Sequence, residues 1–282
     1  MSNTEQSNTE QSNNEQSNNG RSQPHPMLRV DQSGPVLTIT LDDPEHRNCQ
    51  VPSLWTALAE VGAGLDPSVR VVLVRANGQS FSAGLDRAML TPEGAPGEPS
   101  ILGLAMGAAG GGDALEETIA GFQRGFAIWA EVPAITIAAV HGHAIGAGFQ
   151  LALACDLRVV ADDVAFAMRE TSLGLVPDLA GTSPLVRSVG YARALEICVT
   201  GRFVGAPEAV AIGLACMAVP RAHLDATARD LADAILQAPQ AAVRELKPLL
   251  RNAIDASPAD QLRAEREAQA RLLTDMVHSS GK

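Results

Sequence analysis

Aromatic and basic side chains are scarce in this sequence. Aromatic residues make up 3% of the 282 residues, so a core has to be built chiefly from alanine, valine, leucine and isoleucine. Lysine and arginine number 21 against 32 aspartates and glutamates, which gives a formal net charge of −11. A nucleic-acid surface needs clustered basic residues that displace counterions from phosphates. The composition therefore argues against a nucleic-acid partner.

Cysteines and long apolar runs are also few. The four cysteines, at positions 49, 155, 198 and 216, are far apart and show no CxxC or Cys/His ligand spacing. We expect reduced thiols, as in a cytoplasm, and no bound metal. No apolar run is long enough to span a bilayer, and no basic segment followed by an apolar run opens the chain. These features predict a soluble cytoplasmic protein with no membrane partner.

A polar repeat opens the chain. Residues 2–19 read SNTEQSNTEQSNNEQSNN and contain no apolar side chain. Such a segment cannot join a core, so we expect residues 1–26 to be a disordered tail. Strands are expected first and helices last in the remainder, which favours a layered α/β core over residues 27–220 and a helical extension over 221–282.

The apolar pattern of the core predicts short strands alternating with helices. The run LRVDQSGPVLTITL, interrupted by Ser33-Gly34-Pro35, predicts a β-hairpin. Residues 91–113 are rich in glycine, proline and alanine, and we expect a mobile flap there. After residue 184 the pattern is helical apart from an extended run at 217–220. Helices are further expected at 52–65, 112–131 and 146–154, and buried strands at 69–74, 134–140, 157–161 and 165–168.

The segment HGHAIGAGFQLALACDLRV, from His141 to Val159, is the most informative part of the sequence. Glycines and alanines remove side chains from a turn between a buried strand and a helix, so a ligand can reach bare backbone amides. The first amides of a helix lack internal partners and stabilise developing negative charge. The alternative is that small residues only allow close packing. His141 and His143 lack a carboxylate or cysteine partner at ligand spacing and are interpreted as residues at a strand end.

A second turn of the same kind is FSAGLD, Phe81 to Asp86, which also follows a buried strand. Gly84 lets the chain turn so that the Leu85 amide points outward. Asp86 is better suited to cap a short helix through Arg87 and Leu90 than to act as an acid or base.

The stretch ETSLGLVPD places two carboxylates, Glu170 and Asp178, in one loop. Most loop carboxylates are solvated surface groups, so this stretch alone does not establish a catalytic pair.

The ordered combination of FSAGLD, HGHAIGAGFQLALACDLR and FAMRETSLGLVPDLAGT resembles the crotonase family, the enoyl-CoA hydratase/isomerase superfamily, from about residue 27 to at least residue 220. The resemblance implies a spiral of β-β-α repeats with C-terminal helices that assemble a homotrimer or a homohexamer. It implies acyl-CoA thioester substrates and no cofactor, since coenzyme A is part of the substrate. The thioester oxygen would be held by the Leu85 and Ala147 amides, with Ala83, Gly84 and Gly146 against the substrate.

Two acid/base positions of the family fall on Glu170, which keeps the glutamate, and on Gln150, which does not. Glutamine orients water or substrate but cannot accept a proton as a carboxylate does. Asp178 stands where hydratases of the family usually have glycine and dienoyl-CoA isomerases have aspartate. Isomerisation with Glu170 and Asp178 as proton carriers is therefore favoured. Hydration of a 2-enoyl-CoA in fatty-acid β-oxidation and acyl-CoA binding without turnover remain the alternatives.

Overall fold

A seven-stranded sheet forms the base of the molecule in the computed structural model, which describes residues 21–107 and 112–280. The first three strands pair in an antiparallel manner, and every later neighbour is parallel. In spatial order the strands are β1 (Arg21–His25), β2 (Leu28–Ser33), β3 (Val36–Leu41), β5 (Val71–Ala76), β7 (Ile135–Val140), β9 (Leu157–Ala161) and β12 (Met217–Val219).

Shorter strands form a second layer. β4 (Cys49–Gln50) pairs with β6 (Gly84–Leu85), and β10 (Ala165–Ala167) lies between β8 (His143–Ile145) and β11 (Val204–Gly205). A bridge between Ser82 and Ala144 connects the two groups. Along the chain, β3, β5 and β7 are each followed by one strand of the second layer, and β9 is followed by two, β10 and β11. The chain therefore winds as a spiral of repeated units, as the crotonase resemblance implied.

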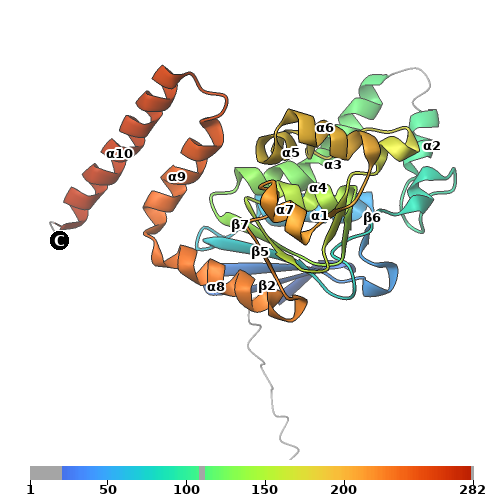
Figure 1. Cartoon of the computed structure of the whole chain (residues 1–282), viewed down its shortest axis with the longest axis horizontal. Helices are drawn as coiled ribbons and strands as arrows, with labels where there is room; N and C mark the ends of the chain where they lie inside the picture. The colour runs from blue at the N-terminus through green and yellow to red at the C-terminus, as the bar shows by residue number, and fades with distance from the viewer. Residues whose placement is uncertain (1–20, 108–111, 281–282) are drawn as a thin grey trace, which may run out of the picture.

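Helices fill the space around these layers (Figure 1). The helices of the core are α1 (Pro52–Ala63), α2 (Ile101–Gly107), α3 (Gly112–Glu131), α4 (Ala147–Ala154), α5 (Thr182–Val189), α6 (Tyr191–Thr200), α7 (Ala206–Ala211) and α8 (Leu224–Gln237). Side chains of α1, α3 and α4 share one hydrophobic cluster with the layer strands, whereas α8 closes a second cluster on the large sheet. Four short 3-10 helices, Pro44–His46, Arg87–Leu90, Glu170–Leu173 and Arg221–His223, complete the described elements.

The last two helices, α9 (Gln240–Asn252) and α10 (Pro258–Ser280), form a pair at the side of the core (Figure 1). Lys247 anchors α9, because its buried ammonium lies 2.8 Å from Asp156 Oδ2 and donates to the Ala134 carbonyl. The helical extension expected from residue 221 thus contains two different parts. Helix α8 packs its apolar residues on the sheet and belongs to the core, while α9 and α10 form the extension proper.

The predicted hairpin, helices and buried strands are present within about two residues of their expected bounds. One expectation is wrong: order begins before Met27, because Arg21–His25 forms β1 and pairs with β2. The polar repeat itself lies outside the described residues. Within the expected flap, residues 101–107 form α2, and residues 108–111 lie outside the described part of the chain.

Candidate active site

Two glycine turns meet where β6 approaches the start of α4. Gly84 has φ of +89°, and a Cβ on it would lie 2.5 Å from the Ile145 carbonyl oxygen and 3.6 Å from the Ala147 nitrogen. A Cβ on Gly148 would lie 2.6 Å from the Ser82 carbonyl oxygen. The two main chains are therefore in direct contact. Ala147 is the first residue of α4, so its N–H has no partner inside the helix.

The buried Ser82 side chain stabilises the turn at Gly84 through hydrogen bonds. The Ser82 hydroxyl donates to the Asn48 carbonyl at 2.7 Å and accepts from the Gly84 amide at 3.1 Å. It also accepts from Gln50 Nε2, and Gln50 Oε1 accepts from the Trp55 indole. Asp86 caps the following 3-10 helix through the Ala88 amide, as predicted. These bonds fix the conformation that presents Leu85.

Gln150 lies one turn along α4 and is 1% exposed. Its side-chain oxygen, Oε1, accepts hydrogen bonds from the Leu179 backbone amide at 2.8 Å and from the Gly181 backbone amide at 3.3 Å. Its Nε2 donates to Glu170 Oε1 at 2.7 Å. Because both ends of the side chain are engaged, the amide has one orientation and connects α4 to the two loops that carry the carboxylates.

Glu170 opens a 3-10 helix and lies against the start of α4. A Cβ on Gly146 would lie 3.3 Å from Glu170 Oε1, so the glycine leaves room for the carboxylate. Glu170 Oε2 is buried and has no hydrogen-bond partner among the described residues. Burial raises the pKa of Glu170, and the charge of Asp178 raises it further against the opposing hydrogen bond from Gln150. The site thus contains a buried carboxylate with a raised pKa, and one of its oxygens accepts no hydrogen bond from the described residues.

Asp178 lies in the loop after that 3-10 helix and is partly buried. Burial raises its pKa, against the effect of its own backbone amide. Gln123 of α3 donates to the Asp178 carbonyl at 2.8 Å, and the same loop continues to the two amides bound by Gln150. Ala180, between those amides, has φ of +61°, an uncommon conformation for a residue with a side chain. Two glutamines therefore hold the loop that carries Asp178.

Gly84, next to Leu85, approaches Ala147, and Gly146 and Gln150 contact Glu170, so these residues lie around the start of α4. Their catalytic roles stay predictions. Ala83 flanks Gly84, and its amide donates to the Arg47 carbonyl, so this amide serves the fold. Sequence reasoning missed Ser82 and Gln123. Ser82 lies inside the FSAGLD motif, where its proximity to Gly84 was available, whereas nothing near Gln123 in the sequence indicates a contact with residue 178.

Comparison with known proteins identifies relatives of this chain. The family model described as enoyl-CoA hydratase/isomerase matches residues 106–281. Carnitinyl-CoA dehydratase of Salmonella arizonae is 32% identical over 255 residues, covering 89% of this chain and 90% of its own. A proposed enoyl-CoA hydratase of Thermobifida fusca YX, solved with acetoacetyl-CoA, is 42% identical with a TM-score of 0.84, covering 88% of this chain and 95% of its own. Enoyl-CoA hydratase of Bacillus anthracis shares 27% identity at a TM-score of 0.74, over 88% of this chain and 91% of its own.

The α/β spiral and the paired glycine turns define an acyl-CoA enzyme of the crotonase type. The chain belongs to the enoyl-CoA hydratase/isomerase family. In the described part of the chain, no helix combines the length and apolarity needed to cross a membrane.

Proposed function

We propose that this protein shifts a carbon–carbon double bond in an enoyl- or dienoyl-CoA thioester. The Leu85 and Ala147 amides hold the thioester oxygen, where negative charge develops when a proton leaves the neighbouring carbon. Glu170 takes that proton, and the electron pair of the broken C–H bond enters the enolate. Delivery of a proton at the far end of the conjugated system completes the shift, and no cofactor takes part.

The observation that carries this proposal is that both polar atoms of the Gln150 side chain are hydrogen-bonded within the protein. Hydration requires a water that is held and deprotonated, commonly between two carboxylates, and the second of these positions is here an amide. Both ends of that amide are engaged, by Glu170 on one side and by two backbone amides on the other. Gln150 therefore supplies no base for water, and Glu170 Oε2 is left for a proton of the substrate.

Asp178 is the proposed second proton carrier. A carboxyl group that delivers a proton has to hold one at working pH, and burial favours the neutral form by raising the pKa of Asp178. In its ionised form Asp178 also raises the pKa of Glu170, so the two groups lie within electrostatic reach of each other. Removal at one carbon and delivery at another can then be divided between them.

Two alternatives follow from specific observations. Hydration or dehydration is favoured by the names of the relatives, a carnitinyl-CoA dehydratase and enoyl-CoA hydratases. Acyl-CoA binding without turnover is favoured by the replacement of one carboxylate position by Gln150. The test is to follow 3-enoyl-, 2-enoyl- and dienoyl-CoA by ultraviolet absorbance and to measure exchange of α-protons in D2O by mass spectrometry.

The proposal expects conjugation to form from 3-enoyl-CoA, and α-proton exchange that is absent in Glu170→Gln. Rapid loss of conjugation from 2-enoyl-CoA without double-bond migration would instead establish the hydratase. Binding with neither exchange nor conversion would establish the non-catalytic alternative.

We further propose that copies of the chain associate through α9 and α10 into a trimer, or a hexamer of two trimers. Support comes from large apolar side chains that these helices and the turn between them expose in the single chain: Leu246, Leu250, Leu262, Leu273, Met276 and Val277 on the helices and Ile254 in the turn. Sedimentation analysis gives the state directly, and a monomer at micromolar concentration would contradict the proposal.

A further inference from the structure

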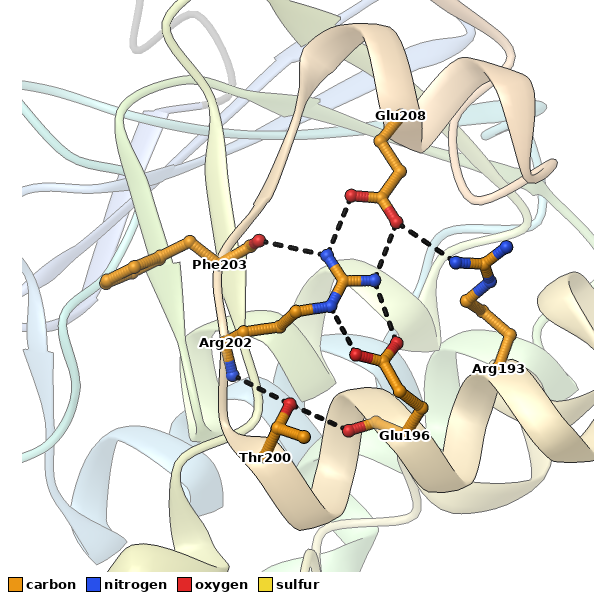
Figure 2. A network of polar contacts seen from close by, with 6 residues as sticks. All are labelled: Arg193, Glu196, Thr200, Arg202, Phe203 and Glu208. Carbon is orange, nitrogen blue, oxygen red and sulfur yellow. Dashed lines mark hydrogen bonds and ion pairs between the residues drawn. The ribbon is translucent and has the colours of Figure 1, made fainter.

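A network of ion pairs surrounds Arg202, next to the turn between α6 and β11 (Figure 2). The guanidinium forms a fork with Glu196 of α6, at 2.5 Å from Nε to Oε1 and 2.8 Å from Nη2 to Oε2. It forms a second fork with Glu208 of α7, at 2.7 Å from Nη1 and 2.6 Å from Nη2. Arg193 approaches Glu208 from the other side at 3.5 Å. We call Arg202, Glu196 and Glu208 the clamp.

The clamp fixes the backbone on both sides of Arg202. Nη1 donates to the Phe203 carbonyl, and the Arg202 backbone amide donates to the Thr200 hydroxyl oxygen. Gly201 closes α6 in the left-handed conformation at φ of +59°. Arginine matches two carboxylates at once because its five N–H groups are arranged in a planar fork. The clamp therefore holds α6 and α7 at a set distance across this turn.

Both neighbours of Arg202 contact Arg169, the residue immediately before Glu170. Arg169 Nη1 donates to the Gly201 carbonyl at 3.0 Å, and the Arg169 guanidinium lies 5.6 Å from the centre of the Phe203 ring. A Cβ on Gly201 would lie 3.3 Å from Arg169 Cδ, so the turn and the arginine are in close contact.

The residue after Glu170 is held by the same helix. The Thr171 hydroxyl donates to the Cys198 carbonyl at 2.7 Å, in the last turn of α6. Glu170 is thus bracketed by two contacts with the end of α6 and its following turn, while its own carboxylate is held from the opposite side by Gln150.

We propose that the clamp positions Glu170 for proton transfer, acting through the α6 turn on Arg169 and Thr171. The clamp residues reach Glu170 only through other residues, so they are positioning residues, and this inference rests on the proposed role of Glu170. Displacing a reacting group by about 1 Å can cost about 10²-fold in rate. Loss of the clamp is therefore expected to lower kcat and to leave substrate binding largely intact.

The test compares Arg202→Gln with a control, Arg271→Gln. Arg271 of α10 forms two parallel hydrogen bonds with Glu245 of α9 at the protein surface, and the control substitution breaks them. Arg202→Gln should reduce kcat for 3-enoyl-CoA about 10-fold with KM within about twofold of wild type, and α-proton exchange should fall in parallel. Arg271→Gln should leave both at the wild-type level. Arg202→Lys keeps the charge but cannot form both forks, and its kcat should lie between those of wild type and Arg202→Gln.

A double-mutant cycle tests the route to Glu170. The losses in kcat caused by Arg169→Gln and Arg202→Gln should not multiply when the two substitutions are combined. The double variant should have about the kcat of the slower single variant. Wild-type kcat in a folded Arg202→Gln variant, an equal loss in Arg271→Gln, or fully multiplicative effects would overturn the inference. Should Arg202→Gln not fold, Glu208→Gln removes one fork, and its expected loss of about threefold in kcat decides the question in the same way.

Failure of this inference is distinguishable from failure of the proposed function. If Glu170→Gln exchanges α-protons as fast as wild type, the role of Glu170 is wrong. If Glu170→Gln loses exchange while Arg202→Gln keeps it, the role of Glu170 stands and the clamp is only structural.

Discussion

Gln150 Nε2 donates a hydrogen bond of 2.7 Å to Glu170 Oε1, from a side chain that is almost completely buried. Because the Gln150 carbonyl is occupied by two backbone amides, the amide cannot rotate to present its oxygen to Glu170 without losing those bonds. One oxygen of Glu170 is thereby held by Gln150, and the other is buried without a hydrogen-bond partner among the described residues. This relationship makes Glu170 the residue on which most of the following expectations depend.

Proline at position 147 removes one of the two proposed amide donors. The first position of a helix tolerates proline, so Ala147→Pro is compatible with α4. Turnover should fall about 10²–10³-fold, the usual effect of losing one oxyanion donor. Steady-state kinetics measures the effect, and Ala147→Gly, which keeps the N–H, is the matched control. Near-normal turnover in a folded Ala147→Pro variant would remove this amide from the mechanism.

Glu170→Gln should make the protein more stable at neutral pH. Burial raises the pKa of Glu170 in the folded state above its value in the unfolded chain. Stability is therefore lost as pH rises from the unfolded pKa through the folded pKa, because the ionised carboxylate disfavours folding. The variant avoids this loss and should melt at a higher temperature near pH 7, with no difference below about pH 4. Thermal unfolding across pH measures this, and a lower melting temperature at pH 7 would contradict it.

Asp178→Asn tests whether Asp178 carries a proton in the reaction or is only a charged residue in a loop. An amide cannot relay a proton, so double-bond migration should fall about 10²-fold or more. The charge of Asp178 raises the pKa of Glu170, so the acidic limb of kcat/KM should also move to lower pH in the variant. Both effects are read from pH-rate profiles with a dienoyl-CoA. Efficient hydration by wild type, with Asp178→Asn indistinguishable from it, would favour the hydratase.

Gln150→Glu restores a second carboxylate beside Glu170. The new charge would lie within hydrogen-bond distance of Glu170 Oε1, and repulsion should raise the pKa values of the pair. We expect a higher ratio of hydration to isomerisation and an acidic limb displaced to higher pH. Gln150→Met, similar in size but without hydrogen bonds, controls for the loss of positioning. No gain in hydration at any pH would show that water has no place beside residue 150.

Removing residues 1–25 should destabilise the protein, whereas removing residues 1–20 should not. The longer deletion takes away β1, leaves β2 as a bare edge and removes the hydrogen bond of 2.9 Å between His25 and Ser53. We expect a melting temperature about 2–6 °C lower for the longer deletion alone. Equal melting of the two shortened chains would show that β1 contributes nothing.

The long buried runs could be predicted because each carries a continuous apolar pattern of strand length, as in β5 and β7. Four strands of two or three residues, β4, β6, β8 and β11, were not predicted, since such lengths contain no measurable period, although the equally short β10 and β12 were. They are defined by pairing with distant partners. The amides of Leu85 and Ala147 could be proposed from the sequence, because glycine-rich turns after buried strands have a local sequence pattern.

The hydrogen bonds of the Gln150 side chain could not be predicted from the sequence. Its partners Leu179 and Gly181 lie 29 and 31 residues away, and their amides carry no sequence information about it. The clamp around Arg202 was hidden for a related reason. Arginine and glutamate on exposed helices are common, and only the tertiary structure shows which of them share two forks.

The contact between the two glycine turns divides the protein into a part that resists change and a part that accepts it. Close main-chain contact at Gly84 and Gly148 sets the spacing of the Leu85 and Ala147 amides, and the buried Ser82 side chain supports it. Side chains of α3 and of the loop carrying Asp178 can then vary without altering that spacing. Directed evolution toward a new acyl group should therefore collect its substitutions in those two segments and retain glycine at positions 84 and 148.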